Sequence, residues 1–282
     1  MIYVSTGGIK NQPAWKTSED FLKHGIKNIE LSGGLSHSDN FKKLKQLKAR
    51  VHFQVHNYFP PPEKPFVLNL SSLNPSVAKR SIEHAKTAMQ WAVEIARPIY
   101  SFHAGYLIDP KIDELGKRIS NKKLFARKSA INVLLDRIND LSQYALGLGV
   151  ELLIENNVLS ANNLKEFGTN PFLMANADEC VYVMENTPSN VNLLIDVAHL
   201  KVSAKSLKFD PVIFLHKCDK WIRAHHLSDN DGKMDSNDPI TEKSWFWPHL
   251  KKDLDYYSLE IYNVSVGELI KELNLTEKIL NQ

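Results

Sequence analysis

The feature that most constrains the fold is a regular alternation of short apolar runs with longer amphipathic segments. Eight runs rich in β-branched and aromatic residues recur along the chain of 282 residues. They lie at Ile2–Ser5, Asn28–Leu31, Val51–Val55, Ile99–Phe102, Val150–Ile154, Asn192–Ile195, Trp221–Ala224 and Tyr257–Leu259. Apolar residues at successive positions are typical of strands that are buried on both faces of a parallel sheet. The pattern therefore predicts eight parallel strands.

The segments between these runs have helical periodicity. In the stretch from 76 to 96, one helical stripe is expected to contain Val77, Ile82, Ala85, Met89 and Val93. The stretch from 126 to 149 has a similar pattern and ends in glycine, which predicts a helix that stops just before the fifth strand.

Eight strands separated by helices in fewer than 300 residues predict an α/β protein with a (β/α)8 TIM barrel. We expect a single barrel domain that spans residues 1–282. A doubly wound open sheet is the competing architecture. It is disfavoured because neither a GxGxxG loop nor a Walker-type loop follows the first strand.

Composition excludes several functional classes. The net charge of +3, from 35 Lys and Arg against 32 Asp and Glu, is too small to indicate nucleic-acid or membrane binding by itself. The two cysteines, Cys180 and Cys218, form no CxxC motif and are expected to be reduced thiols. No apolar run approaches the ~20 residues of a membrane span, and the first residues lack the pattern of a signal peptide. We expect a cytoplasmic protein with no membrane partner.

Polar side chains follow six of the predicted strands, although an apolar strand does not itself require them. They are His56, His103, Glu155, Asp196, His199, His226 and Glu260. In a TIM barrel the carboxyl ends of all strands converge around one axis, so these side chains should meet. The adjacent His225 and His226 point to opposite faces of a strand, and we favour His226 because it lies nearer the strand end.

A cluster of carboxylates and imidazoles implies a cation. Each residue alone has a commoner explanation, because a strand-end Asp or Glu is usually a helix cap or a salt-bridge partner. Together, however, they would repel one another or remain desolvated unless a positive ion held them. Mixed carboxylate and imidazole ligands suit Mn, Zn, Co or Fe better than Ca. The cluster predicts a divalent-metal cofactor, with Mn, Zn and Co as the candidates.

These residues resemble those of the xylose isomerase-like TIM barrel superfamily, which includes sugar isomerases, ketose 3-epimerases and the endonuclease IV family. The resemblance extends from "VSTGG" to "SLEIYN" and includes the DxxH motif "DVAH", which runs from Asp196 to His199, and the segment "HLSDNDGKMD". It implies that the metal ligands are Glu155, Asp196, His226 and Glu260.

The resemblance to isomerases and epimerases also implies a reaction, namely proton transfer next to a metal-chelated carbonyl of a small sugar. Glu155 and Glu260 would be the catalytic acid and base. His199 would orient the substrate or a ligand carboxylate, and Tyr58 and Asp235 are expected to contact the substrate. Further aromatic side chains near the predicted mouth that could stack on a sugar are Phe59, Tyr106, Trp245 and Trp247.

The segment from 56 to 105 resembles the endonuclease IV branch, in which histidines matching His56 and His103 hold a second metal. This resemblance implies an alternative function, a zinc phosphodiesterase that acts on abasic-site DNA or another phosphodiester. Against it, the D-x-H pair for a third zinc is missing, because Asp235 is followed by Ser236 and Asn237.

Three hypotheses therefore stand, and the sugar isomerase or epimerase is favoured. True xylose isomerases carry a lysine after the strand-five glutamate, whereas Asn156 follows Glu155 here, which counts against a hydride-shift isomerase. A barrel that only binds a ligand is disfavoured because the carboxylates are retained. The expected partner is a small-molecule sugar, with nucleic acid as the less favoured alternative. The oligomeric state is left open.

Overall fold

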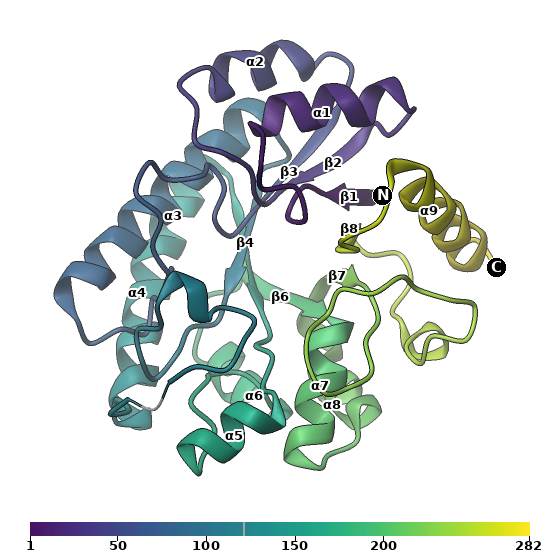
Figure 1. Cartoon of the computed structure of the whole chain (residues 1–282). Coiled ribbons are helices and arrows are strands. Elements are labelled where there is room, and N and C mark those ends of the chain that lie inside the picture. The colour runs from purple at the N-terminus through teal and green to yellow at the C-terminus, as the bar shows by residue number, and fades with distance from the viewer. Residues whose placement is uncertain (121) are drawn as a thin grey trace.

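Eight parallel strands close into a barrel in the order β1-β2-β3-β4-β5-β6-β7-β8, which confirms the predicted fold (Figure 1). The computed structural model describes residues 1–120 and 122–282. The strands are β1 (Ile2–Ser5), β2 (Asn28–Leu31), β3 (His52–His56), β4 (Ile99–His103), β5 (Glu151–Glu155), β6 (Val191–Asp196), β7 (Ile222–Leu227) and β8 (Tyr256–Leu259). The seventh strand continues three residues beyond its predicted end at Ala224, so His226 lies within the strand and pairs with Asp196 of β6.

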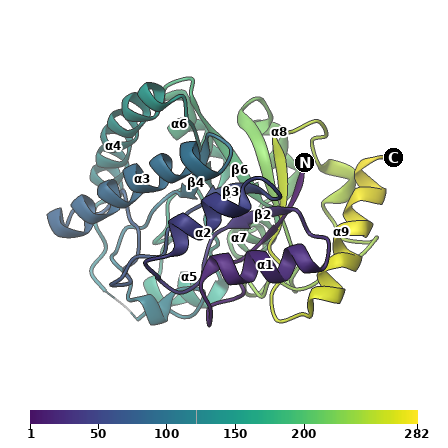
Figure 2. The same ribbon diagram turned by 90° about the horizontal axis from the view of Figure 1, so that it is seen from above.

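Helices surround the barrel on its outer side (Figures 1 and 2). They are α1 (Ala14–Lys23), α2 (Asn40–Leu47), α3 (Pro75–Ile95), α4 (Arg127–Leu148), α5 (Ala161–Phe167), α6 (Ala177–Glu185), α7 (Val197–Leu207), α8 (Pro211–Cys218) and α9 (Val266–Leu280), with short 3-10 helices η1 (Ile112–Glu114), η2 (Asp219–Trp221) and η3 (Trp247–His249). Gly149 adopts a left-handed conformation, with φ of 68°, and ends α4 as predicted. Among the residues that the structure describes, no helix has both the length and the hydropathy needed to cross a bilayer.

The predicted apolar stripe of α3 is partly wrong. Ala85 and Met89 are buried as expected, but 40% of Val93 is exposed. The buried face runs instead through the small residues Ala78, Ala85, Ala88 and Ala92. Small side chains let the helix axis lie close to β3 and β4, which α3 contacts.

The barrel interior is divided into an apolar floor and a polar upper part. Six buried side chains from six strands form a separate apolar cluster, consisting of Tyr3, Ile99, Leu153, Leu194, Ala224 and Tyr256. Strand residues two positions apart point to the same face. Three polar residues lie two positions after a floor residue of the same strand, namely Glu155 after Leu153, Asp196 after Leu194 and His226 after Ala224. The side chains in each pair therefore point to the same face. The floor lies directly beneath the polar cluster.

Buried hydrogen bonds fix the loops above β3 and β4. The side-chain N–H groups of Asn69 donate to the carbonyl oxygens of Tyr106 (3.2 Å) and Ile108 (2.9 Å), and its Oδ1 accepts from the N–H of Tyr106 (3.0 Å). Gly105 has φ of +103°, and a Cβ at this position would lie 2.6 Å from Oγ of Ser71. A glycine is therefore required where these two loops meet.

Candidate metal centre

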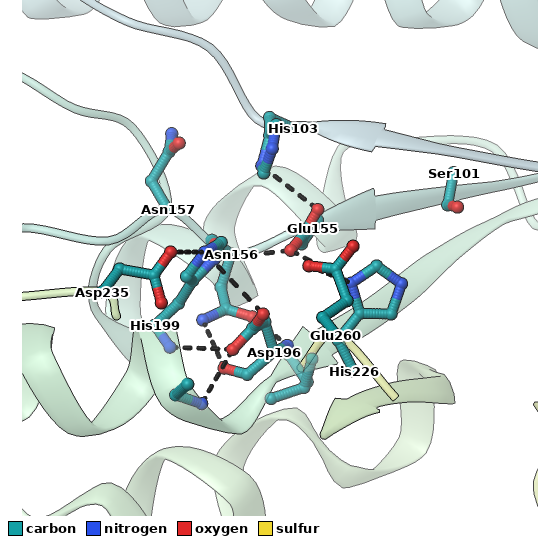
Figure 3. A network of polar contacts seen from close by, with 12 residues as sticks. Ser101, His103, Glu155, Asn156, Asn157, Asp196, His199, His226, Asp235 and Glu260 are labelled. Atoms are coloured by element: carbon teal, nitrogen blue, oxygen red, sulfur yellow. Dashed lines mark hydrogen bonds and ion pairs between the residues drawn. The ribbon is translucent and has the colours of Figure 1, made fainter. Parts of the chain in front are cut away.

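The four residues predicted to bind a metal come together at the carboxyl end of the barrel (Figure 3). Glu155 ends β5, Asp196 ends β6, His226 is the penultimate residue of β7, and Glu260 directly follows β8. One potential ligand atom from each lies within 4.8 Å of the others, and all four side chains are buried. Four strands that are separated in the sequence thus place these side chains next to one another.

The spacing of these groups suits a shared ion better than direct hydrogen bonds. Nδ1 of His226 lies 3.5 Å from Oε1 of Glu155 and 3.5 Å from Oε2 of Glu260. Two ligands that are each about 2.1 Å from a tetrahedral metal lie about 3.4 Å apart. An N–H···O hydrogen bond is shorter, usually about 2.9–3.0 Å. The separations therefore match those of ligands around one cation.

Several polar atoms of the cluster are buried without a hydrogen-bond partner among the described residues. They are both carboxylate oxygens of Glu155, Oδ2 of Asp196, and Nδ1 of both His103 and His226. Burying charged oxygens without hydrogen bonds is costly. A divalent cation would satisfy these atoms together, and three carboxylates with one imidazole suit Mn, Zn or Co. The residues present thus fit a divalent metal.

The electrostatics of the cluster also point to missing positive charge. Burial raises the pKa of Asp196 to about 7. Burial lowers the pKa of His226, but the charges of Glu30, Glu260 and Glu155 outweigh that effect and hold the pKa well above its usual value. Without a metal, the cluster therefore retains protons that balance its carboxylates, and a cation would replace them.

A second group of residues shares Glu155 with the first. Oε2 of Glu155 lies 3.4 Å from Nε2 of His56 and 3.1 Å from Nδ1 of His103. These three residues could also hold an ion. Nδ1 of His56 contacts Oγ of Ser101 at 2.9 Å, which fixes the orientation of its ring. Glu155 thus lies between the two groups, with one oxygen directed to each.

Asp196 and His199 are held by the first turn of α7. Oδ1 of Asp196 accepts hydrogen bonds from the backbone N–H groups of Ala198 (2.7 Å) and His199 (2.8 Å), which caps the helix and leaves Oδ2 in the cluster. Nδ1 of His199 lies 3.3 Å from Oε1 of Glu155, and its Nε2 lies 3.2 Å from Oδ2 of Asp235. The DxxH motif therefore brings both side chains to one site.

A cavity of about 360 Å³ opens beside the cluster. Its wall includes His103, His199 and the other two predicted substrate contacts, Tyr58 and Asp235, together with Tyr106. The volume lies in the range of small-molecule sites. A ligand in this cavity would contact His103 of the second group and His199, which lies 3.3 Å from Glu155.

Three of the predicted aromatic contacts lie elsewhere. Phe59 is fully buried and contacts Trp91 edge-on, with ring centroids 5.5 Å apart. Trp245 and Trp247 pack against the main hydrophobic cluster. The possibility that Phe59 stacks on a sugar is therefore wrong, because its ring is fully buried, and neither tryptophan lines the cavity.

Glu30 belongs to the site but was not predicted. This fully buried residue of β2 places Oε2 3.0 Å from Nε2 of His226, and its Oε1 accepts a hydrogen bond of 2.9 Å from Oγ of Ser258. A search at strand ends does not find Glu30, because Leu31 follows it within the strand. The available signal is a carboxylate inside an apolar strand. His225, by contrast, lies on the outer face, where its ring stacks on that of Tyr257.

Comparisons with known proteins agree with this architecture. The model of the xylose isomerase-like TIM barrel family matches residues 21–264. An uncharacterized protein of Methanocaldococcus jannaschii is 24% identical over 260 residues, covering 89% of this chain and 87% of the relative. The crystal structure of a D-tagatose 3-epimerase-like protein has a TM-score of 0.75 and 19% identity, covering 99% of this chain and 97% of its own. D-psicose 3-epimerase from Clostridium cellulolyticum H10 has a TM-score of 0.70 and 12% identity, covering 99% of both chains.

Proposed function

The chain belongs to the xylose isomerase-like TIM barrel family, and we propose that it is a divalent-metal-dependent isomerase or epimerase of a small sugar. One observation carries the proposal, the buried cluster of Glu155, Asp196, His226 and Glu260 beside a cavity of small-molecule size. The similar structures include a D-psicose 3-epimerase and a D-tagatose 3-epimerase-like protein, which supports a ketose as the substrate.

The four clustered residues would hold the metal through the atoms that face one another. When bound there, Mn²⁺, Zn²⁺ or Co²⁺ would polarise a sugar carbonyl and acidify the neighbouring C–H bond. Oδ2 of Asp196 and Nδ1 of His226 have no hydrogen-bond partner among the described residues, so they are available as ligands.

Glu155 and Glu260 are the groups proposed to move the proton. Neither oxygen of Glu155 has a hydrogen-bond partner among the described residues, so a lone pair can accept a proton from the sugar carbon. Oε1 of Glu260 accepts hydrogen bonds from Oγ of Ser5 (3.2 Å) and the hydroxyl of Tyr262 (3.3 Å), which reduces its basicity. Burial raises the pKa of both carboxyls, but the neighbouring histidines outweigh it, holding the pKa of Glu155 well below its usual value and lowering that of Glu260 to about 2. Hydrogen bonding therefore does not rank them as bases, and we propose that one of the pair removes the proton while the other, protonated at the start, returns one. Glu260 reaches the cluster from a strand three positions away around the barrel.

The cavity wall would orient the sugar. The hydroxyl oxygen of Tyr58 accepts a hydrogen bond from the backbone N–H of Leu68 (3.1 Å), so its own hydrogen remains free to donate to a sugar oxygen. His199 lies 3.0 Å from the carbonyl oxygen of Asn156 through Nδ1 and 3.2 Å from Oδ2 of Asp235 through Nε2, so it would orient Asp235. Oδ1 of Asp235 has no hydrogen-bond partner among the described residues and can accept from a substrate hydroxyl.

A second candidate function, a zinc phosphodiesterase, is supported by the group of His56, His103 and Glu155. Two metal positions that share one carboxylate suit phosphodiester hydrolysis, in which one ion activates the nucleophile and the other stabilises the leaving group. The residues after Asp235 count against this function, because Ser236 and Asn237 offer no imidazole there.

Metal content and isotope exchange test the proposed function together. Elemental analysis of the purified protein should find about one Mn, Zn or Co ion per chain. With D-tagatose, D-psicose or L-ribulose in D₂O, proton NMR should show deuterium entering at the carbon next to the carbonyl. Protein stripped by a chelator should lose this exchange and regain it when the metal is restored.

A DNA substrate distinguishes the two functions. A duplex with a single abasic site should remain intact under the conditions that support exchange. Zinc-dependent cleavage of that duplex, without deuterium incorporation into any of the sugars, would overturn the sugar proposal in favour of the phosphodiesterase.

A further inference from the structure

We propose that Glu30 is a positioning residue of the metal centre, which holds His226 in the tautomer that presents Nδ1 to the cation. The inference rests on the proposed metal-dependent function but concerns a residue outside the proposed ligand set. Through this contact, Glu30 would raise the affinity of the site for the metal.

Glu30 contacts the edge of the His226 ring that faces away from the cluster. Nε2 of His226 lies 3.0 Å from Oε2 of Glu30, whereas Nδ1 of the same ring faces Glu155 and Glu260. Oγ of Ser258 donates to the other oxygen of Glu30 and holds the carboxylate in place. β2 and β7 are not neighbours in the sheet, so this contact spans the barrel interior.

The chemistry of this contact determines which ring nitrogen of His226 carries the hydrogen. An ionised carboxylate only accepts hydrogen bonds, so Nε2 of His226 must carry the hydrogen that points to Glu30. In a neutral imidazole the other nitrogen is then a bare acceptor, and Nδ1 presents its lone pair to the cluster. A carboxylate behind a ligand histidine also raises the basicity of the ligand nitrogen. Full burial of Glu30 and His226 strengthens this interaction.

The geometry favours a hydrogen bond over direct metal binding by Glu30. Glu30, His56 and His226 do offer atoms within 4.8 Å of one another. However, the 3.0 Å separation of Nε2 and Oε2 is a hydrogen-bond length, shorter than the separation of about 3.4 Å expected for two ligands of a tetrahedral ion. His56 has only the hydroxyl of Ser101 behind its ring. Of the two histidines, His226 alone is therefore supported by a carboxylate among the described residues.

Metal titration of three variants tests this role. Full-length protein stripped by a chelator would be titrated with Mn²⁺ by calorimetry as wild type, Glu30→Gln, Glu30→Leu and Glu151→Gln. Glu30→Gln keeps an acceptor oxygen but loses the charge, and Glu30→Leu keeps the approximate volume but loses the acceptor. The dissociation constant should rise about tenfold for Glu30→Gln and towards about 100-fold for Glu30→Leu. Glu151→Gln makes the same chemical change at the amino end of β5 and should bind Mn²⁺ like wild type.

The tautomer gives a readout that a purely structural role would not change. In protein loaded with Zn²⁺ and labelled with ¹⁵N-histidine, NMR should show the hydrogen of His226 on Nε2. In Glu30→Leu this preference should be lost. Should Glu30→Leu bind Mn²⁺ as tightly as wild type, or should wild-type His226 carry its hydrogen on Nδ1, the inference is overturned.

The outcomes separate this inference from the proposed function. Wild type that binds Mn²⁺ and shows the expected order of affinities, but catalyses no deuterium exchange, refutes the isomerase and supports the role of Glu30. Deuterium exchange together with equal affinities in all variants supports the isomerase and refutes the role of Glu30. Wild type that binds neither Mn²⁺ nor Zn²⁺ refutes both. If Glu30→Leu does not fold, Glu30→Gln, which preserves size and one oxygen, decides the question.

Discussion

Asp196→Asn and Asp196→Ala should have different consequences, because the two oxygens of Asp196 face different partners. Oδ1 caps α7 by accepting from the N–H groups of Ala198 and His199, whereas buried Oδ2 faces the proposed ligands without a hydrogen-bond partner among the described residues. Asparagine can keep the cap but cannot supply the second anionic oxygen. Alanine removes both.

The stability difference between the two variants follows from the cap. Replacing an N-cap residue by alanine costs about 1 kcal/mol, and each buried N–H left without an acceptor costs about 1–3 kcal/mol. Ala198 and His199 are both buried. The cap value already includes part of the cost of the two freed N–H groups, so metal-free Asp196→Ala should unfold with a free energy about 2–3 kcal/mol below that of Asp196→Asn. For a chain of this size, that difference corresponds to a Tm lower by roughly 4–12 °C.

This stability difference can be measured by urea unfolding in the presence of a chelator, with circular dichroism as the signal. Mn²⁺ calorimetry measures the effect of losing Asp196 as a ligand. Both variants should bind Mn²⁺ much more weakly than wild type. Asp210 provides a matched control, because it caps α8 through Val212 (2.8 Å) on an exposed surface. Its Asn and Ala variants should leave Mn²⁺ affinity unchanged. Equal stability of the two Asp196 variants, or wild-type Mn²⁺ affinity in Asp196→Asn, would refute this reasoning.

Three further predictions concern the carboxylate pair, the second group and pH. Glu260→Gln should lower both Mn²⁺ affinity and turnover, the latter by ~10²–10⁴-fold, since it removes a general acid–base group. His56→Ala should keep most of the rate of deuterium exchange into the sugar. If His56→Ala is inactive while Glu260→Gln is active, the reaction takes place at the group of His56, His103 and Glu155 instead. Burial lowers the pKa of His84, although the ring contacts the carbonyl oxygen of Asn57 at 3.0 Å. The unfolded chain therefore takes up a proton below about pH 6.5 that the folded protein does not, and stability falls as the pH falls. His84→Gln should reduce the change in urea midpoint between about pH 7.5 and about pH 5.5, and an unchanged difference would contradict this assignment.

The barrel could be predicted from the sequence because its strands are short, apolar and regularly spaced. The same regularity placed Glu155, Asp196 and Glu260 at strand ends, where a TIM barrel brings them together. The alternation of side chains along a strand separated His226 from His225. These inferences depend on local periodicity and on one property of the fold, and both can be read without coordinates.

Contacts across the barrel could not be predicted in this way. Glu30 meets His226 only because β2 and β7 curve around a common interior, and no sequence spacing encodes that distance. Phe59 was misassigned for a similar reason. A loop aromatic next to a strand can face a cavity or the core, and the choice depends on neighbours such as Trp91, which lies more than 30 residues away in the chain.

The apolar floor of the barrel sets the order in which the site can be assembled. Tyr3, Leu153, Leu194 and Tyr256 fill the interior below the carboxylates and block passage from the amino-terminal end of the strands. Under the proposed function, an ion would therefore arrive and leave through the mouth, the same route that a sugar would take to the cavity beside His199. A bound sugar would obstruct this route, so a chelator should remove the metal more slowly while sugar is bound. The ion would then enter before the sugar and leave after it.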